Sequence, residues 1–154
     1  MKIINIKFNF KIFIIFICII ISILSIIFLA SLFKNDTIVM NNENYTQILK
    51  EVHDNLDKYI DKEIFTNGYV FRANDFSENR FVVARDMIVS ENDYRIVGFL
   101  CEYDNIKDFE KNIWIEVKGI IKKKDYHGQM PVIEVFEIKK ITTPNQTFVL
   151  PPKN

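Results

Sequence analysis

The sequence predicts a mainly β domain with one preceding amphipathic helix, attached to a single N-terminal transmembrane helix. Five segments rich in β-branched and aromatic residues follow residue 62, with a short helical segment between the third and the fourth. This order is typical of the OB-fold, a five-stranded and partly open Greek-key barrel. A sandwich or an open meander of the same five strands is the alternative.

The transmembrane helix is predicted over residues 12–33, a run of 22 residues without a charged side chain. At about 1.5 Å rise per residue, a helix of this length spans roughly 33 Å, which is enough for a bilayer core of about 30 Å. The run is apolar on every face, whereas a helix packed on a soluble core usually keeps a polar face. We therefore expect this segment to cross a membrane.

The charges beside this run predict its orientation. Lys2, Lys7 and Lys11 precede the run, while Lys34 is followed at once by Asp36. Because positive flanks stay in the cytoplasm, we expect residues 1–11 to be cytoplasmic and the C-terminal domain to be extracytoplasmic. A cleaved signal peptide is the alternative, but its apolar region is normally shorter, at about 7–15 residues, and ends in an A-x-A-like cleavage site.

The remainder divides into a polar tether over residues 34–43 and an OB-fold-like domain over residues 44–154. A helix is expected at the start of this domain. Its apolar stripe recurs at helical spacing, and consists of Tyr45, Ile48, Leu49, Val52 and Leu56.

Five segments alternate with the two-residue period of strands. They are residues 63–72, 81–89, 94–103, 114–123 and 132–141. In the fourth segment, Ile115, Val117 and Ile121 fall on one face, and Glu116 and Lys118 fall on the other. We therefore expect each strand to bury one face.

Several breaks in this pattern have expected structures. Gly68, Gly98 and Gly119 lie inside strands, where glycine usually marks a bulge or a tight barrel bend. Residues 104–112 are too long for a tight turn and suit a short helix. The tail beyond Pro144 is expected to lie extended over the surface, because proline cannot continue a strand ladder.

Four short motifs carry a resemblance to a known family. They are Gly68-Tyr69-Val70, Val83-Ala84-Arg85, Val97-Gly98-Phe99-Leu100 and Trp114-Ile115-Glu116-Val117-Lys118-Gly119. In order and spacing, over residues 45–152, they resemble the C-terminal domain of the YcgQ-like family. The resemblance implies a bacterial protein of unassigned function, from a group described as subunits of a two-component membrane permease complex.

The chain departs from the family pattern in three ways. The family usually has several N-terminal transmembrane helices, and this chain has room for one. Asp61 stands where the family commonly has glycine. Ser90 and Glu91 stand where the family often has a pair of cysteines, so a thiol or metal role that rests on this pair is not expected here.

Candidate contact residues are few. Arg85 is a charge within an otherwise apolar strand, so it needs a partner. An ion pair across the barrel with Glu116 or Glu134 is the simpler prediction, and contact with a ligand is the alternative.

A second candidate is the basic run at residues 122–124. As a charge run it is most often solvated. The functional alternative is contact with anionic lipid headgroups or an acidic partner surface. The run consists of Lys122, Lys123 and Lys124.

Composition and motifs argue against several classes of function. Residues 35–154 carry a net charge of −4, which argues against nucleic-acid binding. Two histidines and two cysteines argue against a zinc site or a disulfide framework. There is no G-x-S-x-G motif and no phosphate-binding loop. We expect no enzyme activity, no catalytic residues, no cofactor and no metal.

Together these observations predict a single-pass protein of the cell membrane that acts as an accessory or binding module. Its expected partners are the lipid bilayer and, by the family resemblance, a permease-type membrane protein. The alternative is an independent extracytoplasmic OB-fold binder of a small molecule, a metal or an envelope polysaccharide.

Overall fold

A computed structural model describes residues 10–32, 37–91 and 93–153 of the chain. The chain divides into two compact units, Met1–Asn35 and Asp36–Asn154. The predicted cytoplasmic segment up to residue 9 and the start of the predicted tether lie outside the described residues.

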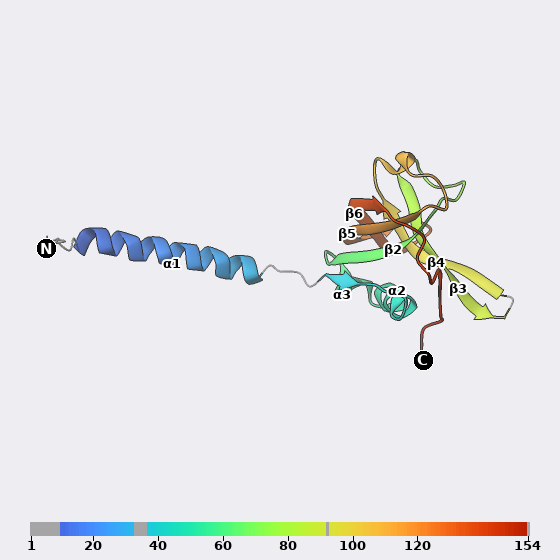
Figure 1. Ribbon diagram of the computed structural model, residues 1–154, viewed down its shortest axis with the longest axis horizontal. Coiled ribbons are helices and arrows are strands. Elements are labelled where there is room, and N and C mark those ends of the chain that lie inside the picture. Colours follow the sequence, from blue (N-terminus) through green and yellow to red (C-terminus); the bar gives the residue numbers. More distant parts are fainter. Residues whose placement is uncertain (1–9, 33–36, 92, 154) are drawn as a thin grey trace, which may run out of the picture. The chain divides into compact units, whose positions relative to one another are not determined.

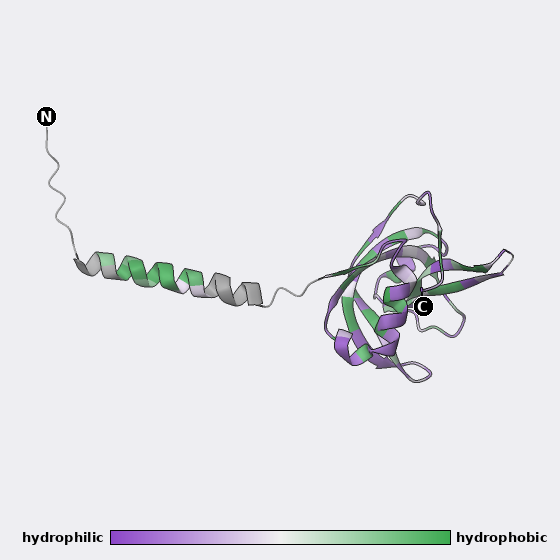
Figure 2. Cartoon of the chain, turned by 90° about the horizontal axis from the view of Figure 1, so that it is seen from below, coloured by the Kyte–Doolittle hydropathy of each residue, from purple (hydrophilic) through white to green (hydrophobic). Residues whose placement is uncertain are grey.

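The first unit contains helix α1, Phe10–Leu32. Its described side chains, at residue 13 and residues 15–25, are hydrophobic almost throughout (Figure 2). The Ser22 hydroxyl donates to the carbonyl of Ile19, and the Ser25 hydroxyl donates to that of Ser22, both at 2.8 Å. Across the described residues, no helix is long and apolar enough to cross a membrane. The transmembrane helix therefore stays a prediction.

The second unit is mainly β, with a closed five-stranded barrel and a preceding helix (Figure 1). The barrel strands are β2 Glu63–Phe71, β3 Arg80–Ser90, β4 Asp93–Glu102, β5 Trp114–Asp125 and β6 Gln129–Lys140. Strand β2 pairs antiparallel with both β3 and β5, β3 with β4, and β5 with β6. A parallel pairing of β4 with β6 closes the circuit. The five predicted strands are confirmed, with ends that differ by at most three residues.

Two of the strand glycines are explained by the barrel geometry. At Gly68, a Cβ atom would lie 2.4 Å from the carbonyl oxygen of Ala84, so only glycine allows β2 and β3 to approach this closely. Gly119 lies at a shift in the register between β5 and β6. The predicted bulge is therefore present at Gly119, whereas Gly68 marks a close approach of two strands.

The predicted helix is present but ends earlier than its apolar stripe. Helix α2 covers Tyr45–Asp54, and a single turn, α3, covers Leu56–Tyr59. Both lie on one side of the barrel in Figure 1. The Tyr45 hydroxyl donates to the carbonyl of Val83 at 3.0 Å, which ties the helix to the core. The short helix expected within residues 104–112 is the 3₁₀ turn η1, Ile106–Asp108.

Asp61 adopts a φ of +65° between α3 and β2. This is the left-handed region, which glycine tolerates best and which aspartate enters more readily than most residues. The departure from the family glycine at this position is therefore compatible with the turn.

Two short strands lie outside the five expected ones. Strand β1, Ile38–Val39, pairs parallel with β2, and Met40 beside it is buried. The tether predicted to reach residue 43 thus ends earlier, because these apolar residues join the barrel. Strand β7, Phe148–Val149, pairs parallel with β3, and Val149 is buried. The tail therefore packs against the sheet, rather than only lying over it.

The β3–β4 hairpin extends beyond the barrel (Figure 1). Its strands remain paired out to Ile88 and Tyr94, and a register irregularity follows between Ile88 and Ser90. Three exposed side chains on this hairpin are apolar or aromatic: Val89, Tyr94 and Ile96, which expose 42%, 60% and 52% of their surface.

Candidate functional site

Arg85 is the most unusual polar residue of the barrel. It lies on β3 with 0% of its surface exposed. Its Nη2 group donates to the side-chain carbonyl of Asn42, in the loop between β1 and α2. The Nε and Nη1 groups find no hydrogen-bond acceptor among the described residues. Burial lowers the pKa of Arg85 from its usual value.

Two aromatic rings take the place of a counter-ion. The guanidinium carbon of Arg85 lies 4.8 Å from the ring centroid of Trp114 and 5.6 Å from that of Tyr45. Such cation–π contacts are worth up to about 2 kcal/mol each when they are desolvated. Burial raises the pKa of Tyr45, so this phenol stays neutral beside the cation.

The predicted ion pair of Arg85 with Glu116 or Glu134 is wrong. Glu134 pairs instead with Lys124, whose Nζ lies 2.6 Å away. Arg85 contacts an amide and two aromatic rings, and no ion pair joins it to a carboxylate among the described residues. The strand register explains this result. Glu134 on β6 lies beside Glu102 on β4 and opposite Ile120 on β5, where it joins the polar network around Glu102.

Each lysine of the predicted basic run is paired with a carboxylate. The Nζ of Lys122 lies 2.6 Å from Asp61, and that of Lys123 lies 2.8 Å from Asp57. Lys124 lies between two acids, 2.5 Å from Glu102 and 2.6 Å from Glu134. The run is therefore charge-balanced within the domain, and its contact with an anionic partner stays a prediction.

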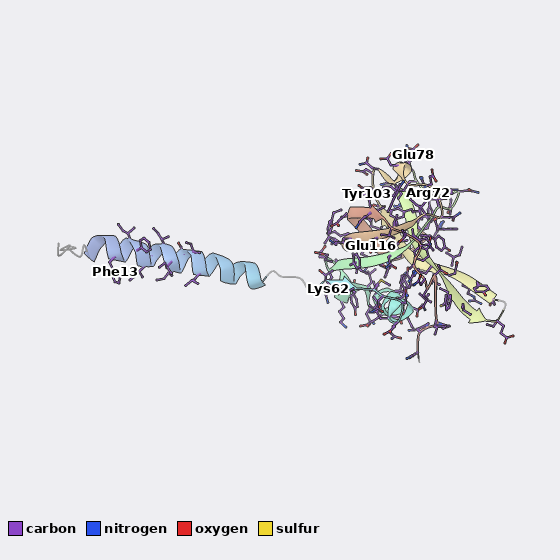
Figure 3. The ribbon with its side chains drawn as sticks, in the orientation of Figure 1. Phe13, Lys62, Arg72, Glu78, Tyr103 and Glu116 are labelled. Atoms are coloured by element: carbon purple, nitrogen blue, oxygen red, sulfur yellow. The ribbon has the colours of Figure 1, made fainter. Side chains whose placement is uncertain are left out.

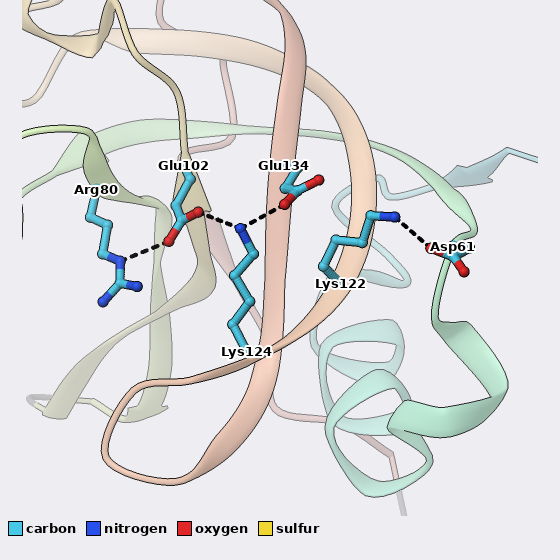
Figure 4. A network of polar contacts seen from close by, with 6 residues as sticks. All are labelled: Asp61, Arg80, Glu102, Lys122, Lys124 and Glu134. Atoms are coloured by element: carbon cyan, nitrogen blue, oxygen red, sulfur yellow. Dashed lines mark hydrogen bonds and ion pairs between the residues drawn. The ribbon is translucent and has the colours of Figure 1, made fainter.

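Glu102 is the centre of this network (Figure 4). Its carboxylate accepts from Arg80 at 2.9 Å and from Lys124 at 2.5 Å. Partial burial opposes the charged form of Glu102, but the hydrogen bonds from Lys124 and Arg80 outweigh it and lower the pKa of the carboxyl group below its ordinary value. The network joins β3, β4, β5 and β6 across one face of the barrel.

The loops at one end of the barrel are also joined by polar contacts. Figure 3 shows Arg72 and Glu78 near each other, away from Lys62; a guanidinium group of Arg72 donates to the Glu78 carbonyl at 2.8 Å. The Tyr126 hydroxyl donates to Asp75 at 2.6 Å. The β2–β3 and β5–β6 loops are thus tied together.

A cleft of about 490 Å³ opens on the outer side of the barrel. It combines aromatic walls with a few polar groups, as small-molecule sites commonly do. Its lining residues are Tyr69, Phe71, Asp86, Ile96, Asn112, Trp114 and Thr147. Trp114 joins the two features, since it lines the cleft and also contacts the guanidinium of Arg85.

A carboxylate and a phenol are linked within the cleft. The Tyr69 hydroxyl donates to a carboxylate oxygen of Asp86 at 2.7 Å. Burial and this neighbouring carboxylate raise the pKa of Tyr69, so the phenol stays protonated and keeps donating. The rings of Tyr69 and Trp114 meet edge to face, with centroids 6.1 Å apart and planes at 68°. The cleft therefore has a fixed aromatic corner beside an oriented negative charge.

Cys101 is buried, and burial raises its pKa well above the usual value, so the reactive thiolate is disfavoured. Among the described residues, no group of three or more His, Cys, Asp or Glu side chains is arranged to hold a metal ion.

The cleft residues were not predicted as a site from the sequence. Tyr69 and Trp114 belong to the family motifs, and an aromatic residue in a strand most simply predicts a packing role. Their pairing across β2 and β5 brings them together, and β3 adds Asp86 from a separate segment. Aromatic residues on the outward-facing side of the predicted strands are the sequence feature that could have identified the cleft.

Comparisons with known proteins identify a family and a distant likeness of fold. The family of the DUF1980 C-terminal domain matches residues 28–151. The UPF0703 protein YcgQ of Bacillus subtilis (strain 168) is 21% identical over 116 residues, which are 73% of this chain and 41% of that protein. The chain thus spans about two fifths of the length of this relative.

Among solved structures, a chain of yeast RPA bound to ssDNA is similar with a TM-score of 0.41 and 10% identity. The similarity covers 73% of this chain and 80% of that one. A likeness at this level carries no argument about function.

Proposed function

This chain belongs to the DUF1980 C-terminal domain family, and from that membership we propose that it is a membrane-anchored accessory module that binds a permease-type membrane protein. Family membership and the relation to YcgQ confirm the resemblance seen in the sequence motifs. The partner class and the membrane attachment are parts of the proposal.

The membrane attachment rests on the uncharged run of residues 12–33. A run of this length and hydropathy is typical of a bilayer-spanning helix. With the basic residues on its N-terminal side, the barrel would lie on the extracytoplasmic side of the cell membrane. An accessory domain held there meets the external loops of a polytopic protein without a search through solution.

The single observation that carries the partner contact is the exposed hairpin of β3 and β4. Val89, Tyr94 and Ile96 expose about half of their surfaces beyond the closed barrel. Apolar and aromatic side chains clustered on a protruding element are typical of protein–protein contacts, because burying them on a partner removes apolar surface from water. A membrane protein whose external surface is apolar at this point is the partner that fits.

A binding role is favoured over catalysis by what the clefts contain. Activated nucleophiles need a base within hydrogen-bond reach. The described residues of the cleft beside Trp114 supply a carboxylate, a phenol, an amide, a hydroxyl and an indole, and the phenol is committed to Asp86. These groups recognise and orient ligands well.

The test is co-purification of the full chain from detergent-solubilised membranes. We expect a polytopic membrane protein to co-purify with the wild type. Combined Val89→Ser and Tyr94→Ser substitution removes apolar surface from the hairpin, and should reduce recovery of the partner at least about tenfold, by analogy with interface hot spots.

Phe136→Ser is the matched control, because Phe136 is also an exposed aromatic residue, at 55%, but lies on β6. It should leave recovery unchanged. Equal loss in both variants, or no polytopic protein with the wild type, would contradict the proposed partner contact.

A second candidate function is an independent binder of a small molecule, and the cleft beside Trp114 favours it. The two surfaces share Ile96, but the hairpin variants change only Val89 and Tyr94, neither of which lines the cleft. Loss of one in a variant therefore leaves the other measurable.

A further inference from the structure

We propose that the cleft beside Trp114 binds a small ligand that carries an ammonium group. This inference goes beyond the accessory role and does not depend on it, because the cleft is formed by the barrel, the segment before β5 and the C-terminal tail rather than by the tip of the hairpin. The argument rests on the aromatic walls, the single charge and the size of the cleft.

Aromatic rings form the walls. Tyr69 and Trp114 stand at 68° to each other with centroids 6.1 Å apart, so their surfaces make a corner. Phe71 supplies a third ring to the lining. Ammonium groups are attracted to the faces of such rings, and sites of this kind commonly combine two or three of them.

The charge of the cleft has the complementary sign. Asp86 is the carboxylate of the described lining, which contains no lysine, arginine or histidine. The Tyr69 hydroxyl holds the carboxylate at 2.7 Å, which fixes its direction without neutralising it. A cation in the cleft is therefore attracted by one formal negative charge, and an anion is repelled by it.

The buried cation of Arg85 opposes this attraction but does not cancel it. Arg85 is fully buried and is not part of the lining, and its guanidinium lies 4.8 Å from the Trp114 ring centroid. Arg85 and Asp86 are consecutive residues of β3, so their side chains leave the strand on opposite faces. Coulomb energy falls inversely with distance, so a cation in contact with Asp86 is attracted by it more strongly than it is repelled by Arg85.

The size of the cleft fits a small molecule rather than a polymer. Its volume of about 490 Å³ lies within the range of about 300–1,000 Å³ that is typical of small-ligand sites. Asn112 and Thr147 at the rim offer an amide and a hydroxyl to a polar group on such a ligand.

The experiment uses Trp114 as a built-in reporter, because it is the single tryptophan of the chain. The full chain in detergent is titrated with choline and with its neutral carbon isostere, 3,3-dimethylbutan-1-ol, while tryptophan fluorescence is recorded. We expect a saturable change with choline, and binding of the isostere at least about tenfold weaker, since only the charge differs.

Asp86→Asn should weaken choline binding by about tenfold or more, because the amide keeps the shape and removes the charge. Asp93→Asn is the matched control, since Asp93 is an exposed acid at the start of β4, and should bind as the wild type does. If Asp86→Asn fails to fold, Phe71→Leu offers a second variant, which removes one ring of the lining and should weaken choline binding severalfold; unchanged affinity in that variant would contradict the proposal.

Several outcomes would overturn the proposal. Equal affinity for choline and the isostere would show an apolar groove without charge recognition. Binding of sodium acetate or of a neutral oligosaccharide in preference to choline would assign the cleft to another ligand class. An absent choline response in the folded wild type would leave the cleft without this function.

Discussion

The domain contains exposed cations and a buried cation, and the two kinds have different partners. Lys122, Lys123 and Lys124 of β5 lie near the surface, and each is matched to a carboxylate within 2.8 Å. Arg85 is fully buried and has an amide and two aromatic rings as its partners. The difference teaches that charge pairing here follows exposure and topology, not proximity in sequence.

The energetic terms differ as much as the contacts. A solvent-exposed ion pair contributes about 0–1 kcal/mol, because water already stabilises both charges. A buried cation loses several kcal/mol of solvation. Cation–π contacts return up to about 2 kcal/mol each, and a hydrogen bond from a charged donor returns about 1.5–3 kcal/mol. The charge of Arg85 therefore contributes little to the net free energy of unfolding, and the packing of its side chain contributes more.

The largest expected effect separates volume from charge at this position. Arg85→Ala should be less stable than Arg85→Met by about 2–5 kcal/mol, because alanine leaves a cavity in a packed core and methionine fills most of it. Urea unfolding of the full chain in detergent, followed by Trp114 fluorescence, measures the difference. Similar stability of the two variants would mean that the core around residue 85 relaxes to fill the space that alanine leaves.

A smaller effect is expected in the surface network. Glu102→Gln removes the carboxylate shared by Arg80 and Lys124, and should cost about 1–2 kcal/mol at pH 7. Folding lowers the pKa of Glu102 from its ordinary value of about 4.5. The charge of Glu102 therefore stabilises the folded protein fully at pH values above about 4.5. The difference between wild type and variant should therefore shrink as the pH falls below 4.5.

Lys123→Met is the control for this prediction. Its partner Asp57 exposes 81% of its side chain, so the change should stay under about 0.5 kcal/mol. A cost equal to that of Glu102→Gln would contradict the ranking by exposure. A difference for Glu102→Gln that is constant from pH 7 to pH 3 would show that its charge is not the source of the stabilisation.

Much of the fold could be predicted because the alternation of apolar residues sets which face of each strand is buried. All five barrel strands and the helix at Tyr45 were predicted from this pattern. The two-residue strands β1 and β7 could not be, since two residues are too few to show a period. Their pairing depends on β2 and β3 lying beside them, which only the closed barrel provides.

The site was less predictable, for a physical reason. A lone charge in an apolar strand correctly marked Arg85 as unusual, but its partners come from a loop, a helix and another strand. Aromatic rings stabilise cations well in a dry environment, but the sequence does not show which rings lie near Arg85. The cleft likewise assembles from β2, β3, β4, β5 and the tail, so no sequence window contains it.

The most direct test of the contrast between the two kinds of cation is the unfolding free energy of Arg85→Met against that of the wild type. Methionine keeps the apolar volume and removes the charge that lacks a carboxylate partner. We expect the variant to equal the wild type or to exceed it by up to about 2 kcal/mol, as found when buried charges are replaced by apolar side chains of similar size. A loss of more than about 2 kcal/mol would contradict the account, because it would mean that the guanidinium is held by a strong acceptor.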